Sequence, residues 1–172
     1  MTMSINLQPT LQGSLIKLRP LQESDFDEVY SVASDSLIWE QHPANDRYQR
    51  SVFEKFFDDA MKSGGAFVAI DLKENKIIGS SRYNDYDAEQ KSIEIGWSFL
   101  ARSYWGGSYN GEMKQLMLQH AFQFVDAVNF VIGPDNIRSQ KAVKKIGGVK
   151  VASKYDENGE ERVIYQITSL SE

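Results

Sequence analysis

Apolar and polar residues alternate over residues 92–100, where Ile93, Ile95, Trp97 and Phe99 occupy every second position. A two-residue period places these four side chains on one face of a β-strand. Other short apolar runs, bounded by turn residues, predict further strands at 15–19, 66–72, 76–83, 128–132, 149–154 and 162–168. The turns at 73–75 and 156–159 predict that the strands on either side of each form antiparallel hairpins.

Apolar residues instead recur every three or four positions in four other stretches, which predicts amphipathic helices. These stretches are a helix capped by Ser24, then 48–62, 111–126 and 136–146, with a short helix and loop at 35–47. Gly64-Gly65 and Gly147-Gly148 end two of them. The fold class is therefore mixed α/β, with a β-meander first and a βαβα order later. No repeat or linker divides the 172 residues, which predicts one domain over 1–172.

Composition narrows the classes of function. Nineteen basic and 24 acidic residues give a net charge of −5, which disfavours nucleic acid as a partner and fits a small cationic or amine-bearing substrate. The chain has no Cys, which excludes disulfides and thiolate catalysis, and with two His a metal site is not expected. It shows neither an apolar leader nor a long apolar run, so we expect a cytoplasmic protein that does not enter a membrane.

The stretch Tyr104-Trp105-Gly106-Gly107-Ser108-Tyr109-Asn110-Gly111-Glu112 joins a predicted strand to a predicted helix. Glycines at this junction let a ligand approach the backbone, and the helix start offers unpaired N–H groups that suit a phosphate or pyrophosphate. A helix N-terminus with a tight turn and no ligand is the alternative. One strand later, Asn136-Ile137-Arg138-Ser139 opens the next helix, and the two features together favour a cofactor site.

These segments resemble the GNAT superfamily of acetyl-CoA-dependent N-acetyltransferases, and within it the RimJ/RimL-like branch of ribosomal-protein N-terminal acetyltransferases. The likeness spans about residues 13–170. It is carried by Leu15-Ile16-Lys17-Leu18-Arg19-Pro20-Leu21, by Ile93-Glu94-Ile95-Gly96-Trp97, by the glycine loop, and by Asn136-Ile137-Arg138-Ser139 with Lys145-Ile146-Gly147. The resemblance implies a GNAT-like acyl-CoA N-acyltransferase fold: a mostly antiparallel sheet with a splayed parallel pair and flanking helices.

The chain departs from the family pattern at three positions. Ser108 and Asn110 stand where the loop usually has a glycine and an alanine. The Cβ of Ser108 fits only if its φ is negative, and both side chains offer donors for phosphate oxygens. Val143 stands where many members have a tyrosine that acts as the leaving-group acid, which leaves Ser139 as the candidate near the sulfur.

The resemblance implies acetyl-CoA as the cofactor and an amine as the acceptor, either a protein N-terminus or a small amine. The pantetheine arm is expected along the backbone of Phe99, Leu100 and Ala101, with Asn136 as a further partner. The pyrophosphate is expected over the N–H groups of Trp105, Gly106, Gly107, Ser108, Tyr109, Asn110 and Gly111. A homodimer stays open, because the pattern does not decide whether the chain pairs with itself.

Glu94 is the leading candidate for the general base, because it is expected on the strand face opposite Ile93, Ile95 and Trp97, and burial would raise its pKa. A solvent-facing glutamate is the alternative. Asn136 has the alternative role of an ordinary N-cap, and Ser139 that of a first-turn serine bonded to backbone. Without Cys or a paired Ser and His, direct attack by the amine is favoured over a covalent enzyme intermediate.

Trp39, His42 and Tyr83 are the candidates for lining the acceptor pocket, with loop packing as the alternative for His42. His120 falls among apolar positions and is expected to pack. The main competing function is a non-catalytic acyl-CoA-binding or regulatory module, motivated by Ser108, Asn110 and Val143. A different nucleotide-binding α/β protein is a third hypothesis.

Overall fold

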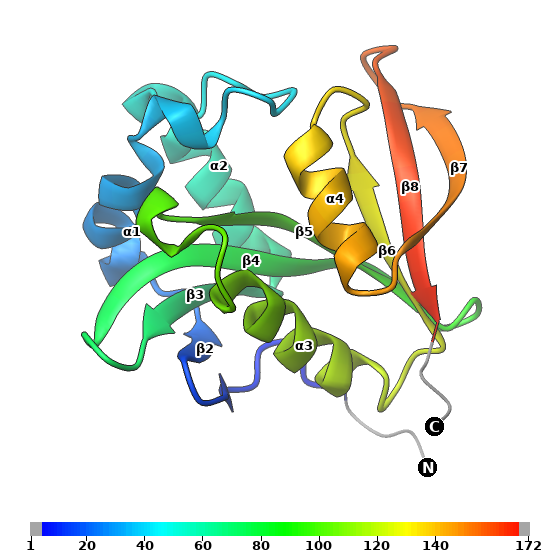
Figure 1. The fold of residues 1–172 in the computed structure, drawn as a ribbon, viewed down its shortest axis with the longest axis horizontal. Helices are drawn as coiled ribbons and strands as arrows, with labels where there is room; N and C mark the ends of the chain where they lie inside the picture. Colours follow the sequence, from blue (N-terminus) through cyan, green and yellow to red (C-terminus); the bar gives the residue numbers. More distant parts are fainter. Residues whose placement is uncertain (1–4, 169–172) are drawn as a thin grey trace.

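In the computed structural model, which describes residues 5–168, the strands form one eight-stranded sheet of order β1-β2-β3-β4-β5-β6-β8-β7 (Figure 1). The strands are β1 (Leu11–Gln12), β2 (Ile16–Pro20), β3 (Ala66–Asp71), β4 (Lys76–Asp87), β5 (Ser92–Leu100), β6 (Ala127–Ile132), β7 (Val149–Tyr155) and β8 (Glu161–Thr168). All neighbouring strands are antiparallel except β5 and β6. The predicted architecture, a mostly antiparallel sheet with one parallel pair, is confirmed.

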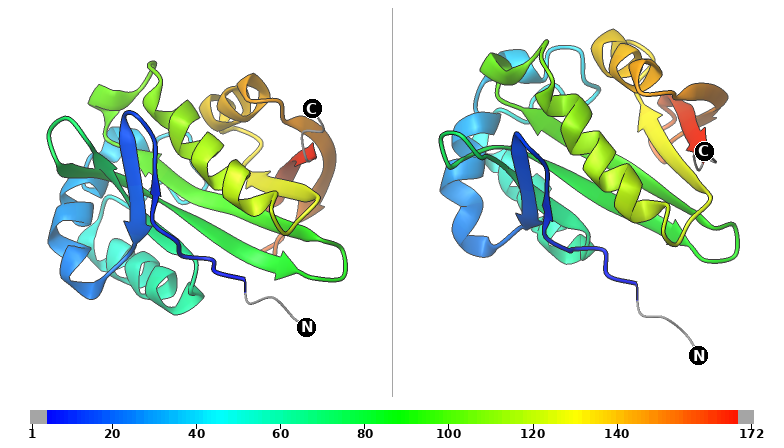
Figure 2. Two further views of the ribbon diagram at one scale, coloured as in Figure 1. Left: turned by 90° about the horizontal axis from the view of Figure 1, so that it is seen from below. Right: turned by 60° about the horizontal axis from the view of Figure 1, so that its bottom comes forward.

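Helices cover both faces of the sheet (Figure 2). The α-helices are α1 (Phe26–Ala33), α2 (Arg50–Ser63), α3 (Tyr109–Ala121) and α4 (Ile137–Lys145), and short 3-10 helices are η1 (Glu23–Asp25), η2 (Ser36–Ile38) and η3 (Arg102–Tyr104). Helices α1 and α2 bury an aromatic layer that includes Phe26, Phe53 and Phe57 against one face. Helix α3 packs on the other face through Met113 and Met117.

The parallel pair separates soon after it forms. Strands β5 and β6 are joined by only three residue pairs, of which Glu94 and Asn129 are the last. Beyond this point β5 continues to Leu100 beside β4, while β6 continues to Ile132 beside β8. Within residues 5–168, the side of β5 that faces β6 therefore has no partner strand over residues 95–100. A wedge-shaped gap opens in the middle of the sheet (Figure 1).

A β-bulge in β5 changes which side chains share a face. Trp97 has a positive φ of 52°, and the pairing with β4 shifts between Ser80 and Arg82. Ile93 and Ile95 pack under α3, whereas Trp97 and Phe99 pack with the aromatic layer of α1 and α2. The predicted single face for all four residues is therefore wrong, because alternation holds only up to the bulge. Ser98 and Leu100 consequently join the α3 side.

The predicted helices and strands are present with shifted ends, and β1 was not predicted. Helix α3 begins at Tyr109 and ends at Ala121, earlier than the predicted 111–126 at both ends. The N-cap of α1 is Asp25, not Ser24, because the chain first forms η1. Gly64 ends α2 in the left-handed conformation, as the double glycine predicted. Residues 169–170, the last of the expected likeness, lie outside the described residues.

Glu112 fastens the first turn of α3 to the β1–β2 turn. Its carboxylate accepts hydrogen bonds from the N–H groups of Ser14, Leu15 and Ile16, and from the Ser14 hydroxyl, at 2.8–3.2 Å. Burial raises the pKa of Glu112, but these bonds outweigh that effect and hold the pKa below its usual value. Glu112 therefore fixes where α3 begins relative to the sheet.

Replacing Glu112 by alanine should lower the free energy of unfolding by about 1–3 kcal/mol, because it leaves half-buried N–H groups without an acceptor. The contribution of Glu112 is complete above its unfolded pKa and is lost as pH falls through its lower folded pKa. Denaturant unfolding at pH 7 and pH 3 measures both effects. Glu54→Ala, which removes an exposed ion pair with Arg50, is the matched control and should change stability by less than ~1 kcal/mol. Equal effects of the two variants would contradict this role.

Candidate active site

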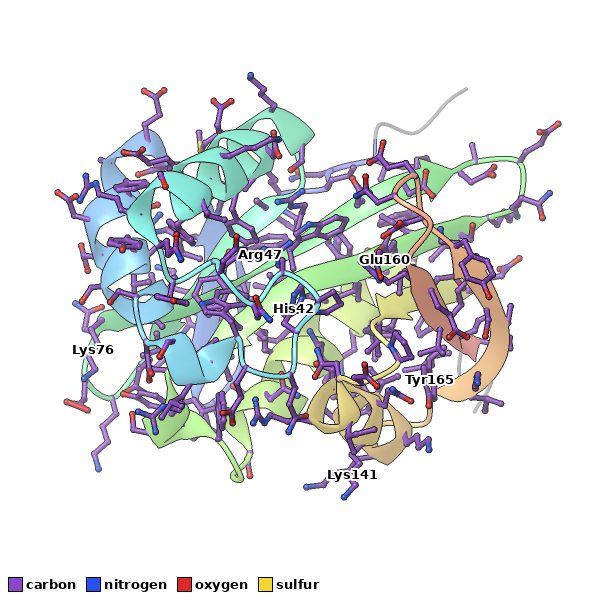
Figure 3. All side chains as sticks on the ribbon, turned by 90° about the horizontal axis from the view of Figure 1, so that it is seen from above. His42, Arg47, Lys76, Lys141, Glu160 and Tyr165 are labelled. Atoms are coloured by element: carbon purple, nitrogen blue, oxygen red, sulfur yellow. The ribbon has the colours of Figure 1, made fainter. Side chains whose placement is uncertain are left out.

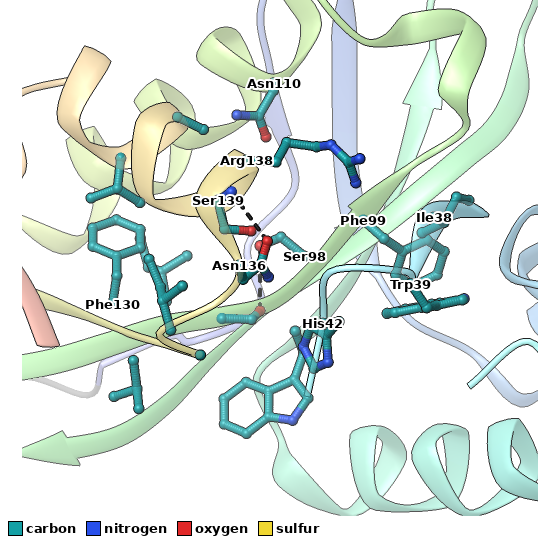
Figure 4. Close-up of a pocket in the computed structure, with 18 of the residues that line it drawn as sticks. Ile38, Trp39, His42, Ser98, Phe99, Asn110, Phe130, Asn136, Arg138 and Ser139 are labelled. Atoms are coloured by element: carbon teal, nitrogen blue, oxygen red, sulfur yellow. Dashed lines mark hydrogen bonds between the residues drawn. The ribbon is translucent and has the colours of Figure 1, made fainter. Parts of the chain in front are cut away.

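A cavity of about 450 Å³ occupies the gap between β5 and β6 (Figure 4). The two strands form its walls, the first turn of α4 lies along one side, and the start of α3 lies at one end. The loop at 39–47 closes it from the side of α1 and α2. Pro43 in that loop packs so closely on Gly133, at the end of β6, that a Cβ on Gly133 would lie 2.4 Å from the proline ring. The cavity therefore spans both faces of the sheet through its gap.

The glycine loop at the α3 end of the cavity exposes a series of backbone donors. Gly106 adopts a φ of 77°, which favours glycine, whereas Ser108 has a φ of −95°. Because this φ is negative, the loop accommodates the Cβ of Ser108, as the prediction from the sequence required. Among the described residues, no acceptor is found for the N–H groups of residues 106–111. Unpaired N–H groups and the helix dipole make this turn suitable for an anion.

Two tyrosines hold the ends of this loop. The hydroxyls of Tyr104 and Tyr109 donate to the two carboxylate oxygens of Asp71, at 2.9 and 3.0 Å. Burial raises the pKa of Asp71, but the two tyrosine hydrogen bonds help to outweigh it, so the pKa lies below its usual value. Because both flanking residues are bound to one carboxylate of β3, the glycines between them are held in place before any ligand binds.

The start of α4 differs from that of α3, because its donors are already used. The Arg138 N–H donates to the Gln41 side chain at 3.0 Å, and the Ser139 N–H donates to the Asn136 side chain at 3.3 Å. Asn136 is therefore an N-cap, which was the alternative prediction for it. In the part of the chain that the structure describes, the helix N-terminus that leaves backbone donors unpaired in this cavity is that of α3.

Glu94 lines the cavity where β5 and β6 separate. Burial raises the pKa of Glu94 to about 7, and a hydrogen bond from the Asn84 side chain opposes the shift. A carboxyl group with a pKa near neutrality exchanges protons at physiological pH, as a general base must. Of the two interpretations from sequence, the structure supports a glutamate that faces a cavity over one that faces open solvent.

Ser139 and Asn136 line the same cavity from α4, opposite Ser98 of β5 (Figure 4). The Ser98 hydroxyl lies 2.7 Å from the hydroxyl of Ser81 and accepts a hydrogen bond from Lys114. Lys114 is only 6% exposed, and burial lowers its pKa to about 7. Hydroxyl groups therefore stand on both walls of the gap, with an acidic group where the strands part.

The GNAT acetyltransferase family model matches residues 16–149, which is most of the chain and contains the cavity walls and the glycine loop. The chain belongs to the GNAT acetyltransferase family. No curated protein sequence matches it. The cofactor predicted from the sequence, acetyl-CoA, fits this family, and related structures were solved with CoA-disulfide and with acetyl-CoA.

Solved structures share the fold at low sequence identity. A GCN5-related N-acetyltransferase from Brucella melitensis has a TM-score of 0.78 at 20% identity, over 94% of this chain and 79% of that one. Mycobacterium smegmatis RimJ, in complex with CoA-disulfide, has 0.72 at 16%, over 94% and 88%. The microcin C7 self-immunity acetyltransferase MccE, in complex with acetyl-CoA and AMP, has 0.77 at 15%, over 96% and 100%. At these identities the likeness shows the fold alone.

All the predicted site residues except Tyr83 line the cavity of this acetyltransferase or lie beside it. Those that line the cavity are Trp39, His42, Glu94, Phe99, Leu100, Trp105, Gly106, Asn110, Asn136 and Ser139. Ala101, Gly107, Ser108, Tyr109 and Gly111 belong to the strand end and glycine loop beside it. The Tyr109 side chain points to Asp71 and is occupied in holding the loop.

Tyr83 does not line the acceptor pocket, and that prediction is wrong. It is 1% exposed, packs against Phe67, and donates its hydroxyl to the Met117 carbonyl under α3. Its place in β4 puts it on the α3 face, whereas the loop with Trp39 and His42 lies on the other face. Sequence spacing within β4 did not reveal this face. His120 packs at the edge of a Tyr83–Phe124 cluster, in line with its expected packing role.

Four cationic residues of the cavity were not predicted: Arg47, Lys114, Arg138 and Arg162. Lys114 had a signal in the sequence, because it lies three, four and seven positions before the buried Met117, Leu118 and Ala121. Arg138 stands inside the Asn136–Ser139 motif, and its guanidinium lies 4.1 Å from the centre of the Trp105 ring. Arg47 lies in an irregular loop and had no such signal.

Within residues 5–168, no cluster of three or more His, Asp or Glu side chains is arranged to hold a metal ion. None of the helices in this part of the chain has the length and apolar character needed to cross a membrane.

The raised pKa of Glu94 predicts a stability that depends on pH. Between the unfolded pKa of 4.5 and the folded value of about 7, the folded state keeps a proton that the unfolded chain releases, so stability falls as pH rises. Glu94→Gln should therefore be more stable than the parent at pH 8 by ~1–3 kcal/mol, and by much less at pH 4.5. Denaturant unfolding at both pH values measures this. Glu89→Gln on an exposed turn is the control, and a gain that does not vary with pH would contradict the assignment.

Proposed function

We propose that this protein transfers an acetyl group from acetyl-CoA directly to an amine, through one domain that comprises the whole chain. The carrying observation is that one cavity connects the free N–H groups at the start of α3 with Glu94, whose pKa is near neutrality. Family membership supports acetyl transfer, and the cavity supports the amine as the group that receives it.

The described residues fit acetyl-CoA. The N–H groups of residues 106–111 would hold the pyrophosphate, and the free side of β5 over residues 95–100 would bind the amide groups of the pantetheine arm. Asn136, which caps α4 with its side-chain oxygen, keeps its side-chain nitrogen for the cofactor. Acetyl-CoA, when bound, supplies the acetyl group as a reactive thioester.

Glu94 would remove a proton from the incoming ammonium group, so that the nitrogen lone pair is free to attack. Burial, which raises the pKa of Glu94, matches it to this task at neutral pH. The Ser139 hydroxyl, on the opposite wall, would donate a hydrogen bond to the departing sulfur, because Val143 offers no proton. The chain has no Cys, which agrees with direct transfer.

Two kinds of amine are candidates for the acceptor. One is a protein N-terminus, which the RimJ/RimL-like resemblance favours, and the other is a small amine. RimJ and MccE are both similar in fold to this chain, so the fold does not choose between them. Release of CoA thiol from acetyl-CoA with a panel of peptides and small amines tests transfer itself. Tight CoA binding with no thiol release on any amine would favour the alternative, a non-catalytic acyl-CoA-binding module.

Gly107→Glu should weaken CoA binding by about 10-fold or more, because it places a negative charge at the loop that receives the pyrophosphate. The fold should stay intact, since a Cβ on Gly107 meets no atom within 4 Å. Isothermal titration with CoA measures the affinity. Asn158→Glu on the exposed β7–β8 turn adds the same charge and should leave the affinity unchanged. Similar affinities for both variants would remove the loop from the binding site.

Glu94→Gln should reduce kcat/KM by about 10²–10⁴-fold near neutral pH, because the variant cannot accept a proton. The parent rate should rise with pH through about 7, where Glu94 loses its proton, and the variant should lack that rise. Steady-state rates from pH 5.5 to 8.5 test this, with Glu89→Gln as a control. A variant that keeps the parent pH profile would exclude Glu94 as the base.

A further inference from the structure

Two hydrogen-bond donors face each other in the loop that closes the cavity. The Nε2 atom of His42 lies 3.3 Å from a terminal guanidinium nitrogen of Arg47, and both side chains line the cavity. Figure 3 shows the two residues side by side at the centre of the face covered by this loop. The contact looks like a hydrogen bond, but the protonation of His42 decides whether it is one.

The hydrogen bond at the other ring nitrogen of His42, Nδ1, determines which nitrogen carries the proton. The Ala44 N–H donates to His42 Nδ1 at 2.9 Å, so Nδ1 must be an acceptor and carries no proton. Burial, together with the charges of Arg47 and Arg162, lowers the pKa of His42 to about 3, so the ring is neutral at physiological pH. A neutral imidazole keeps one proton, which is therefore on Nε2. His42 and Arg47 thus present N–H groups to each other and have no lone pair between them.

Arg47 is held in place by aromatic rings and not by an acid. Its guanidinium carbon lies 4.8 Å from the centre of the Phe56 ring and 5.5 Å from that of Trp39. Burial and the charge of Arg82 lower the pKa of Arg47 to about 10, which leaves it protonated at neutral pH. No carboxylate within residues 5–168 lies at ion-pair distance from Arg47. The aromatic rings fix the faces of the guanidinium and leave edge donors free.

Two further arginines, Arg82 and Arg162, lie near Arg47, and the charges of Asp59 and Glu94 act on Arg82. Arg82 is 6% exposed, and its Nε and one terminal nitrogen are buried without a hydrogen-bond partner among residues 5–168. The positive charges of Arg82 and Arg162 both lower the pKa of Arg47, while Asp46 raises it. Arg162 is paired with Asp156 at 2.9 Å.

We propose that His42 and Arg47 bind an anionic group, a carboxylate or a phosphate, of the amine that this protein acetylates. The proposal rests on the proposed function, because it names the class of acceptor. An oxygen of such a group accepts from His42 Nε2 and from the guanidinium at once, and supplies the lone pairs that the two donors lack. Glu94, which lines the same cavity, is left to receive the proton of the amine.

The chemistry of this pair selects among small amines. An amino acid, a short peptide with a free carboxylate or a phosphorylated amino sugar brings both an amine and an anion. A polyamine brings only positive charges, which the unpaired charge of Arg47 repels, and it offers no anionic oxygen to the two donors. Acceptors that carry an acid are therefore expected over acceptors that carry none.

Matched pairs of product analogues test the proposal without requiring turnover. The CoA-loaded protein is titrated with N-acetylglycine against N-acetylglycinamide, and with N-acetylglucosamine 6-phosphate against N-acetylglucosamine. We expect the anionic member of at least one pair to bind about 10- to 100-fold more tightly than its neutral partner. The pair that shows the preference tells whether the group is a carboxylate or a phosphate.

Variants assign the preference to this site. Arg47→Gln should abolish the difference within the pair, and Arg47→Lys, which keeps the charge but not the planar fork, should retain part of it. Arg50→Gln is the matched control, because Arg50 also lies over aromatic rings, those of Phe26 and Tyr30, outside this cavity. Thermal unfolding of each variant verifies that the fold is intact.

Histidine NMR gives a readout that a purely structural role would not move. The chain has two His residues, and His120→Gln assigns the remaining signal to His42. Binding of the anionic analogue should raise the pKa of His42 above its free value of about 3, and the neutral analogue should leave it unchanged.

Equal binding within both pairs, or a preference that persists in Arg47→Gln, would overturn the proposal. The proposed function fails separately, because its test is thiol release. If amines are acetylated regardless of an attached acid, only the anion site is wrong. If the anionic analogue binds but no amine releases CoA thiol, the anion site stands and acetyl transfer to amines does not.

Discussion

The separation of β5 and β6 is the constraint on which the rest of this structure depends. The two parallel strands pair through Glu94 and Asn129 and then diverge, because β5 follows β4 while β6 follows β8. Among the described strands, this divergence leaves one side of β5 without a partner. It opens a cavity through the sheet and brings the first turns of α3 and α4 to its edges. It also places Glu94 at the point where the two strands separate, where burial raises the pKa of Glu94 to about 7.

The two helix starts at this cavity have different tasks because their backbone donors have different partners. The N–H groups at the start of α4 already donate to the side chains of Gln41 and Asn136. Helix α4 therefore forms a wall of the cavity without offering these donors to a ligand. At the start of α3, the N–H groups of residues 106–111 have no acceptor in the described part of the chain, and Asp71 and Glu112 hold the loop that carries them. These contacts keep the N–H groups oriented before a ligand binds, which lowers the entropic cost of binding.

Local patterns predicted much of the fold, and the departures have physical causes. The order of helices and strands and the position of the glycine loop follow from periodicity and turn residues, whereas the parallel pair was expected only from the resemblance to the GNAT family. The bulge at Trp97 was not predictable from alternation, because it depends on how β4 and β5 pair, and it reassigns the faces of Trp97 and Phe99. The prediction for Tyr83 was wrong for a similar reason, because the spacing of residues in β4 does not show which face of the sheet its side chain occupies. Arg47 was missed, because a loop residue shows its function only when folding brings it against Trp39 and Phe56.

Backbone amide NMR during titration with CoA tests the central claim most directly, namely that the start of α3 receives the diphosphate. The account predicts large shift changes and slowed hydrogen exchange for residues 106–111, smaller changes along residues 95–100 of β5, and little change for the N–H groups of Arg138 and Ser139, which are already bonded. Changes confined to α4, or to a surface away from the β5–β6 gap, would contradict it.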